Sequence, residues 1–244
     1  MEKVLSQEKC FIHFWVKKKI LYEIEKFNEG SEKLVSKNVR YKCVEPSKID
    51  EIVPELLLVD NAIIDVGASS VDEFLQNSKE HNLFDVIDMI VIPTVLESKQ
   101  VADIIKIVKE LQKFGSSEEK IFIVLNKVKE ELDNNKAIEQ NPHYNSLALS
   151  FSSTGVEYDP EYRLLEYEVV DKISELELSI ADVLADKTDY MKEIERIKKD
   201  ENIPKEEKLK SVKELYDKHL VQKRAKEMQK DFERLAARLA VFIK

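Results

Sequence analysis

The sequence predicts an α/β protein with a mainly parallel, Rossmann-like sheet, followed by a helical C-terminal segment. Short apolar runs alternate with segments of helical periodicity, which is the pattern of α/β folds. The later runs are continuous rather than alternating, as in parallel strands covered on both faces. Only four glycines occur among 244 residues, which argues against a glycine-rich all-β fold. We expect an α/β domain over residues 1–160 and a helical extension over 161–244, packed on it as a hairpin.

Five apolar runs are the expected strands. They cover residues 10–16, 20–24, 62–66, 87–93 and 121–125. The last three are rich in Ile and Val, and helical segments separate them along the chain. Strands and helices in this order predict right-handed crossovers between parallel strands.

The helical segments are read from their apolar spacing and their ends. Residues 47–58 and 71–78 are two expected helices, although Pro54 is awkward inside the first. Residues 97–114 form the clearest helix, and Gly115 is well placed to cap its C-terminal end. Two capping boxes are expected at helix starts, Ser70 with Glu73 and Thr94 with Glu97. After a polar loop over 152–160, we expect only helices from about residue 164, the last of them with Pro204 in its first turn.

Composition excludes several classes of protein. A net charge of −9 argues against a protein that coats nucleic acid over its whole surface. The two cysteines and four histidines show no metal-ligand spacing, and two reduced thiols suit a cytoplasmic protein. The run 10–16 is too short to cross a bilayer, so we expect no transmembrane segment and a cytoplasmic location.

Two of the expected strands end in polar residues that suit a ligand site. The run 62–66 ends in Asp65-Val66 with Gly67 next, and the run 121–125 is followed by Asn126. Open α/β sheets bind ligands at the carboxyl ends of their strands, where Asp can hold a metal ion and Asn can read a base. The residues alone leave alternatives open: an ordinary strand-to-helix turn at Gly67, and an Asn126 that caps a following helix.

The order of these motifs resembles the ParA/MinD-like partition ATPases, and within them the StbB plasmid-stability proteins. The resemblance rests on DVGAS (65–69), DMIVIPTVLESKQ (88–100) and IFIVLNKV (121–128), supported by LEYEVV (165–170) and IADVLADKTDY (180–190). It implies a P-loop NTPase-type fold used in plasmid maintenance or DNA positioning, with ATP and Mg²⁺ as cofactors. It places Asp65 on the magnesium side, Gly67 near the γ-phosphate, Pro93 beside the nucleotide and Asn126 at the base. The partners it implies are a second copy of the chain, a plasmid partition protein or DNA.

The sequence departs from this family at the phosphate loop. Family members carry a Gly-rich loop ending in Lys-Thr after their first strand, and residues 1–19 contain no such loop. We therefore expect a degenerate nucleotide site and negligible ATP hydrolysis by this chain. The alternative is a non-enzymatic interaction scaffold that uses the charged C-terminal helices, because residues 216–244 carry eight Lys or Arg against four Asp or Glu.

Overall fold

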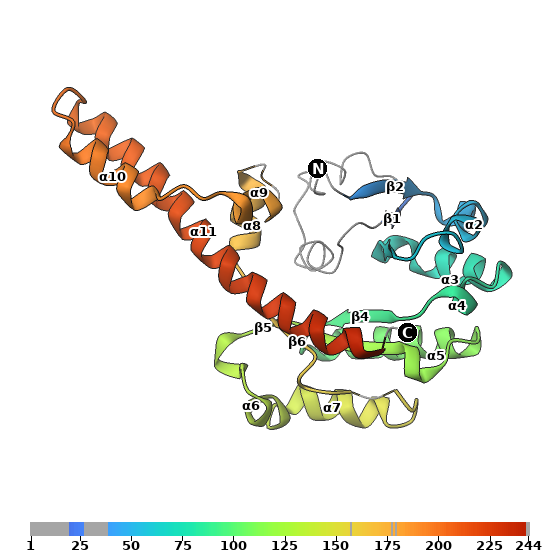
Figure 1. Cartoon of the computed structure of the whole chain (residues 1–244). Helices are drawn as coiled ribbons and strands as arrows, with labels where there is room; N and C mark the ends of the chain where they lie inside the picture. The colour runs from blue at the N-terminus through green and yellow to red at the C-terminus, as the bar shows by residue number, and fades with distance from the viewer. Residues whose placement is uncertain (1–19, 27–38, 157, 177, 179, 243–244) are drawn as a thin grey trace.

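The computed structural model describes residues 20–26, 39–156, 158–176, 178 and 180–242, and its core is an α/β arrangement of parallel strands (Figure 1). The described strands form two three-stranded sheets, ordered β2-β1-β3 and β4-β5-β6, and within each sheet neighbouring strands are parallel. The prediction of an α/β fold with parallel strands is therefore confirmed. The strand predicted over 10–16 lies outside the described residues.

The strands match the apolar runs with two exceptions. The first sheet contains β1 (Ile20–Ile24), β2 (Arg40–Val44) and β3 (Ala62–Val66), and the second contains β4 (Ile90–Thr94), β5 (Ile121–Val128) and β6 (Arg163–Leu165). Strand β2 was not predicted, because its sequence RYKCV is half polar and only partly buried at a sheet edge. The prediction of helices alone from residue 164 was wrong, since β6 pairs with β5 there.

Short helices connect the strands, and longer ones cover them. Before β6 the chain forms η2 (Pro46–Glu51), α2 (Val53–Leu56), η3 (Ala68–Ser70), α3 (Val71–Glu80), α4 (Leu83–Val86), α5 (Ser98–Lys113), η4 (Glu118–Lys120), η5 (Glu130–Leu132), α6 (Asn135–Glu139) and α7 (Pro142–Phe151). After β6 it forms α8 (Val169–Glu175), α9 (Ile180–Ala185), α10 (Tyr190–Lys199), α11 (Lys205–Leu239) and η6 (Ala240–Phe242).

The predictions of where the helices begin and end were only partly correct. The helix predicted over 47–58 is split into η2 and α2, and Pro54 lies in the first turn of α2, where its missing N–H costs nothing. Neither predicted capping box forms, because Ser70 makes no side-chain cap bond and α5 begins after Glu97 without one. The cap at Gly115 is confirmed: its φ is 98°, and its N–H donates to the Gln112 carbonyl at 3.1 Å.

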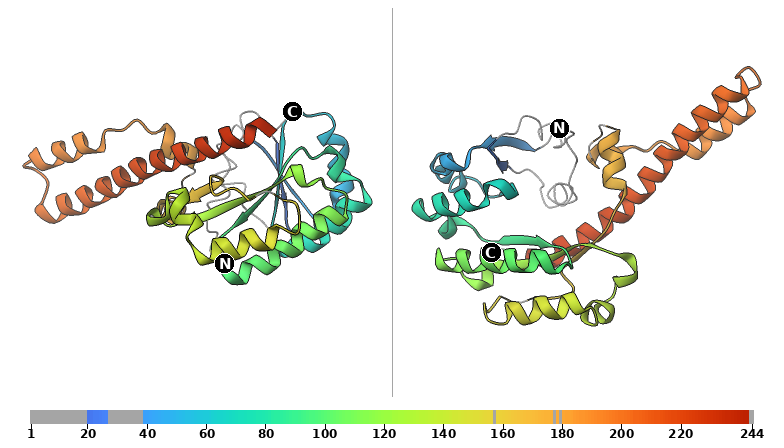
Figure 2. Two further views of the ribbon diagram at one scale, coloured as in Figure 1. Left: turned by 90° about the horizontal axis from the view of Figure 1, so that it is seen from below. Right: turned by 180° about the vertical axis from the view of Figure 1, so that it is seen from behind.

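Two layers of side chains hold the sheets between helices. One core joins both sheets to α3 and α5, with Tyr22 and Ile123 fully buried in it. The second core covers the other face of the second sheet, where Phe122 and Val124 share a cluster with Phe232 of α11. Figure 2 shows α11 crossing beside the strands on the side away from α5 and α7.

A buried carboxylate fixes α11 to the edge strand β6. Asp231 lies in the middle of α11 with 6% of its surface exposed, and it accepts a hydrogen bond from the Leu165 N–H at 3.0 Å. Arg234, one turn further along the helix, pairs with the same carboxylate. Burial raises the pKa of Asp231 in spite of this cation. Asp231 therefore accepts the hydrogen bond of the Leu165 N–H, a backbone donor of β6 that is not bonded to β5.

The N-terminal half of α11 leaves the sheets and pairs with α10. These two helices form a hairpin that projects from the rest of the chain (Figures 1 and 2). Among the helices that the structure describes, none is both long and apolar enough to cross a membrane.

Candidate functional site at the carboxyl ends of the strands

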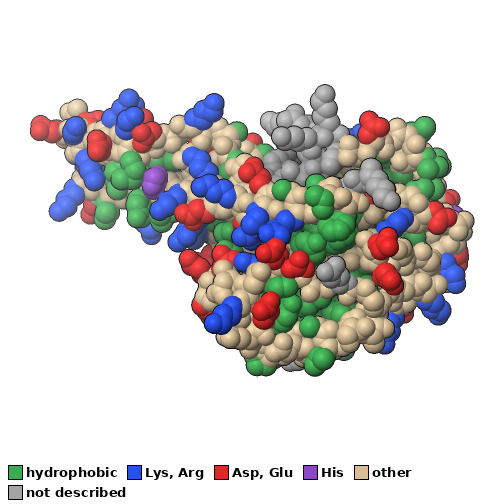
Figure 3. Space-filling view, turned by 60° about the horizontal axis from the view of Figure 1, so that its bottom comes forward, with side chains coloured by type: hydrophobic (Ala, Val, Ile, Leu, Met, Phe, Trp, Pro, Cys, Tyr) green, Lys and Arg blue, Asp and Glu red, His purple; other side chains and the backbone are tan. Residues whose placement is uncertain are grey.

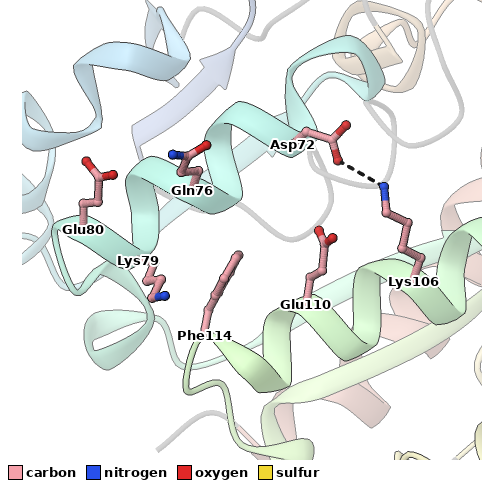
Figure 4. Close-up of a pocket in the computed structure, with 7 residues that line it drawn as sticks. All are labelled: Asp72, Gln76, Lys79, Glu80, Lys106, Glu110 and Phe114. Carbon is pink, nitrogen blue, oxygen red and sulfur yellow. Dashed lines mark ion pairs between the residues drawn. The ribbon is translucent and has the colours of Figure 1, made fainter.

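Helices α3 and α5 lie side by side and run in the same direction (Figure 4). Lys106 Nζ, in the middle of α5, lies 3.8 Å from Asp72 Oδ1 at the start of α3. At the C-terminal ends of the two helices, Lys79 Nζ lies 5.1 Å from the centre of the Phe114 ring. In an α/β crossover a helix runs back along the strand it follows. Strands β3 and β4, which lead into α3 and α5, therefore end on the same side of the molecule.

This side carries all four residues that the sequence singled out. Asp65 is the fourth residue of β3, and Gly67 directly follows that strand. Pro93 belongs to β4. Asn126 belongs to β5 and comes directly after Leu125, which pairs with Thr94 of β4. The residues belong to two sheets, and no pairing among the described strands joins β3 to β4. The four residues therefore lie on the same side of the molecule, although the described strands that carry them form two separate sheets.

Gly67 lies directly against Glu25, the residue that follows the neighbouring strand β1. Its N–H donates to the Ile24 carbonyl at 3.1 Å, and its φ of −62° is one that any residue adopts. A Cβ at this position would lie 1.8 Å from Oε1 of Glu25, so the carboxylate of Glu25 occupies the space above the glycine. The glycine is explained by close packing rather than by an unusual backbone angle.

We predict that Gly67→Ala destabilises the protein only slightly, by less than about 1 kcal/mol. The φ value tolerates alanine, and the atom in the way is the far end of a flexible side chain that can rotate toward solvent. Urea unfolding of both proteins measures the effect. Gly115→Ala is the matched comparison, because its φ of 98° strains any side chain and a larger loss is expected. A larger loss at Gly67 than at Gly115 would show that Glu25 is held rigidly.

Asp65 lies beside a second, buried carboxylate. It is in register with Glu23 of β1, so the two side chains point to the same face of the first sheet. Glu23 is 3% exposed and accepts a hydrogen bond from the Tyr41 hydroxyl of β2. Burial, and then the bond to Glu23, raise the pKa of Tyr41, which therefore stays a donor at neutral pH. With Glu25 next to Gly67, three acidic side chains gather at this end of the sheet.

Asn126 is buried and engaged locally. Its Oδ1 accepts a hydrogen bond from the Lys127 N–H at 3.0 Å, and the side chain is 3% exposed. The alternative that Asn126 caps a helix was wrong, because β5 continues to Val128. Lys127 has a φ of 53°, a left-handed conformation that is rare outside glycine. Such strained positions concentrate at functional sites, and no pattern in the sequence marks this one.

Pro93 and Thr94 complete the end of the second sheet. Pro93 is exposed and in register with Val124, and β4 is an edge strand among the described residues, which suits a residue without an N–H. Thr94 is 1% exposed and donates to the Val95 carbonyl at 3.3 Å rather than forming the predicted cap.

A groove that was not predicted lies between the two parallel helices (Figure 4). Its volume is about 560 Å³, and it is lined by Asp72, Gln76, Lys79, Glu80, Lys106, Glu110 and Phe114. None of the four predicted residues lines it. Charged positions on two separate helices look like solvated surface in a sequence, so only the fold reveals that they face each other.

The residues nearest Gly67 include a carboxylate and a lysine that is already paired. Nowhere in the described part of the chain do three His, Cys, Asp or Glu side chains lie in position to hold a metal ion. A phosphate above Gly67 would meet the Glu25 carboxylate. Lys26, the next residue, is ion-paired with Glu73 at 2.8 Å.

Comparisons with protein-family models, curated proteins and solved structures found no match to this chain.

Proposed function

We propose that this chain is a ParA/MinD-like protein of plasmid stability, partition or DNA positioning, similar to the StbB proteins. In this proposal its sheets belong to a Rossmann-like, P-loop NTPase-type fold whose nucleotide site is degenerate, and the chain hydrolyses no ATP. The observation that carries the degenerate site is the gathering of three acidic side chains, Glu23, Glu25 and Asp65, at the end of the first sheet beside Gly67.

Electrostatics supports the absence of hydrolysis. Phosphoryl transfer depends on positioning and on positive charge around the transferred group. At the end of the first sheet Glu23, Glu25 and Asp65 supply negative charge instead. A triphosphate placed there is repelled, and a single magnesium ion bound to Asp65 does not cancel the other two carboxylates. The charges at the strand ends are thus compatible with a fold whose nucleotide chemistry has been lost.

We expect ATP with Mg²⁺ to leave the melting temperature unchanged. A nucleotide present at a hundredfold excess over its dissociation constant would stabilise the protein by about 2.7 kcal/mol, a shift of roughly 5–10 °C for a chain of this size. The measurement is thermal unfolding with ATP, with and without Mg²⁺, against sodium sulfate of equal ionic strength. Phosphate release is measured in parallel. Magnesium-dependent stabilisation that Asp65→Asn abolishes would contradict the proposed degenerate site.

The role in plasmid maintenance needs a separate measurement. A plasmid carrying the gene for this chain is followed over many generations without selection, beside one in which the gene has an early stop codon. Faster loss of the second plasmid supports the role, and Asp65→Asn should then behave as the wild type. Equal retention of both plasmids would reject the proposed biological role while leaving the fold untouched.

A second candidate function, a non-enzymatic interaction scaffold, is favoured by the projecting hairpin. Leu209 and Tyr216 of α11 are 73% and 47% exposed on it. A scaffold would engage its partner through these helices and would need no site at the strand ends.

A further inference from the structure

The hairpin of α10 and the first half of α11, called the arm here (residues 190–220), has an apolar face that nothing in the described chain covers. Leu209, Val212 and Tyr216 follow the spacing i, i+3, i+7 and lie along one side of α11. The ring of His219 stacks on Tyr216, with centroids 6.3 Å apart. Leu209 and Tyr216 are among the exposed large hydrophobic side chains of the described residues.

Met191 of α10 adds to this face. Lys208 Nζ donates to the Lys198 carbonyl at 3.3 Å, and Gln222 Nε2 donates to the Asp186 carbonyl at 2.7 Å. These two bonds fix an antiparallel register in which Met191 is level with Tyr216. Met191 is 43% exposed. We call Met191, Leu209, Val212 and Tyr216 the arm patch; Figure 3 shows hydrophobic side chains gathered on the projecting arm between Lys, Arg, Asp and Glu.

A two-helix hairpin buries only the seam between its helices. Ile194 is the buried residue of α10, and it faces α11. Two such hairpins can cover each other's open faces by forming a four-helix bundle, which is a stable and common arrangement. In a symmetric pair the same patch meets itself, so no second kind of surface is required.

Charge favours a second copy of this chain as the occupant. The arm carries nine Lys or Arg against eight Asp or Glu, whereas the rest of the chain carries thirty against forty. Two whole chains repel each other through their net negative charge, but two nearly neutral arms do not. The projection of the arm also holds the acidic α/β parts apart when the arms meet (Figure 2).

We propose that the arm patch is a self-association surface through which two copies of this chain form a four-helix bundle. This inference goes beyond the proposed function and does not depend on the state of the nucleotide site. The ten residues of α10 span about 15 Å, so each copy offers a face of about 300–400 Å². That is less than the roughly 800 Å² per partner of a standard interface, so the dimer is weak and depends on concentration.

The test is sedimentation velocity of the full chain from 5 to 500 μM. The expected result is a rise in average mass from 28.4 kDa toward twice that value over this range. The double variant Leu209→Lys, Tyr216→Lys should stay monomeric at every concentration. The matched control is Leu149→Lys on α7, a leucine that is 75% exposed outside the arm and should leave association unchanged.

Circular dichroism and thermal unfolding show whether each variant is folded before its mass is compared. A wild-type chain that is monomeric at 500 μM would overturn the proposal and would point to a different protein as the occupant of the arm. A dimer that survives the double variant, or that Leu149→Lys disrupts equally, would also overturn it, because association would then use another surface.

Discussion

Replacing Phe232 with alanine is expected to lower the free energy of unfolding by about 3–5 kcal/mol, the usual cost of removing a buried phenylalanine. Phe232 has no exposed surface and lies on α11 in the core that covers the second sheet. Its ring meets Tyr167 edge to face, with centroids 6.4 Å apart. Alanine would leave a cavity between the helix and β5, because the sheet and α8 cannot close onto it without losing their own contacts.

Urea unfolding followed by far-UV circular dichroism measures this loss. The matched control is Leu149→Ala, because Leu149 is 75% exposed and its replacement should change the free energy by less than about 0.5 kcal/mol. If Phe232→Ala cost less than 1 kcal/mol, α11 would not be an integral part of the core. A separate early transition in the variant would show that α11 unfolds on its own.

Strands β3 and β5 were predictable from their short, continuous apolar runs. The runs Ala62–Val66 and Ile121–Val128 are rich in Ile and Val, and both lie in parallel sheets under helices. Strand β2 was not predicted because it is an edge strand with polar Arg and Lys side chains. One of them, Lys42, donates a hydrogen bond from Nζ to the Glu55 carboxylate at 2.6 Å. Edge strands are stabilised by such local pairs, which have no periodic signature.

The candidate site was predictable in position but not in its contacts. Asp65 and Asn126 were expected at one edge because parallel strands end together, and the parallel course of α3 and α5 puts the ends of β3 and β4 on the same side. The carboxylate above Gly67 could not be foreseen, since Glu25 directly follows β1, more than forty residues earlier in the chain. The failed capping boxes have a similar cause: the turns after β3 and β4 follow the geometry of the sheet, which overrides the preference of Ser70 and Thr94 for capping.

Arg163 holds the loop that follows β5, and no pattern in the sequence marks it. It is the first residue of β6, and its side chain is 11% exposed. Its Nε donates to Asp133 at 3.0 Å, and one terminal nitrogen donates to Asn135 Oδ1 at 2.7 Å and to the Pro160 carbonyl at 2.9 Å. One guanidinium therefore joins β6 to the loop after Val128, next to Asn126 and the strained Lys127.

We expect Arg163→Met to lower the free energy of unfolding by about 2–3 kcal/mol, because hydrogen bonds to charged groups are worth about 1.5–3 kcal/mol and Asp133 is left without its cation. Amide hydrogen exchange at residues 126–135 should accelerate more than exchange in α3. The matched control is Arg224→Met, since Arg224 is 65% exposed and pairs with Glu227 at 2.9 Å on the surface of α11. Exposed pairs of this kind contribute about 0.5 kcal/mol or less. Equal losses in the two variants would show that Arg163 acts only as a surface charge, and the end of β5 would then be held by its backbone alone.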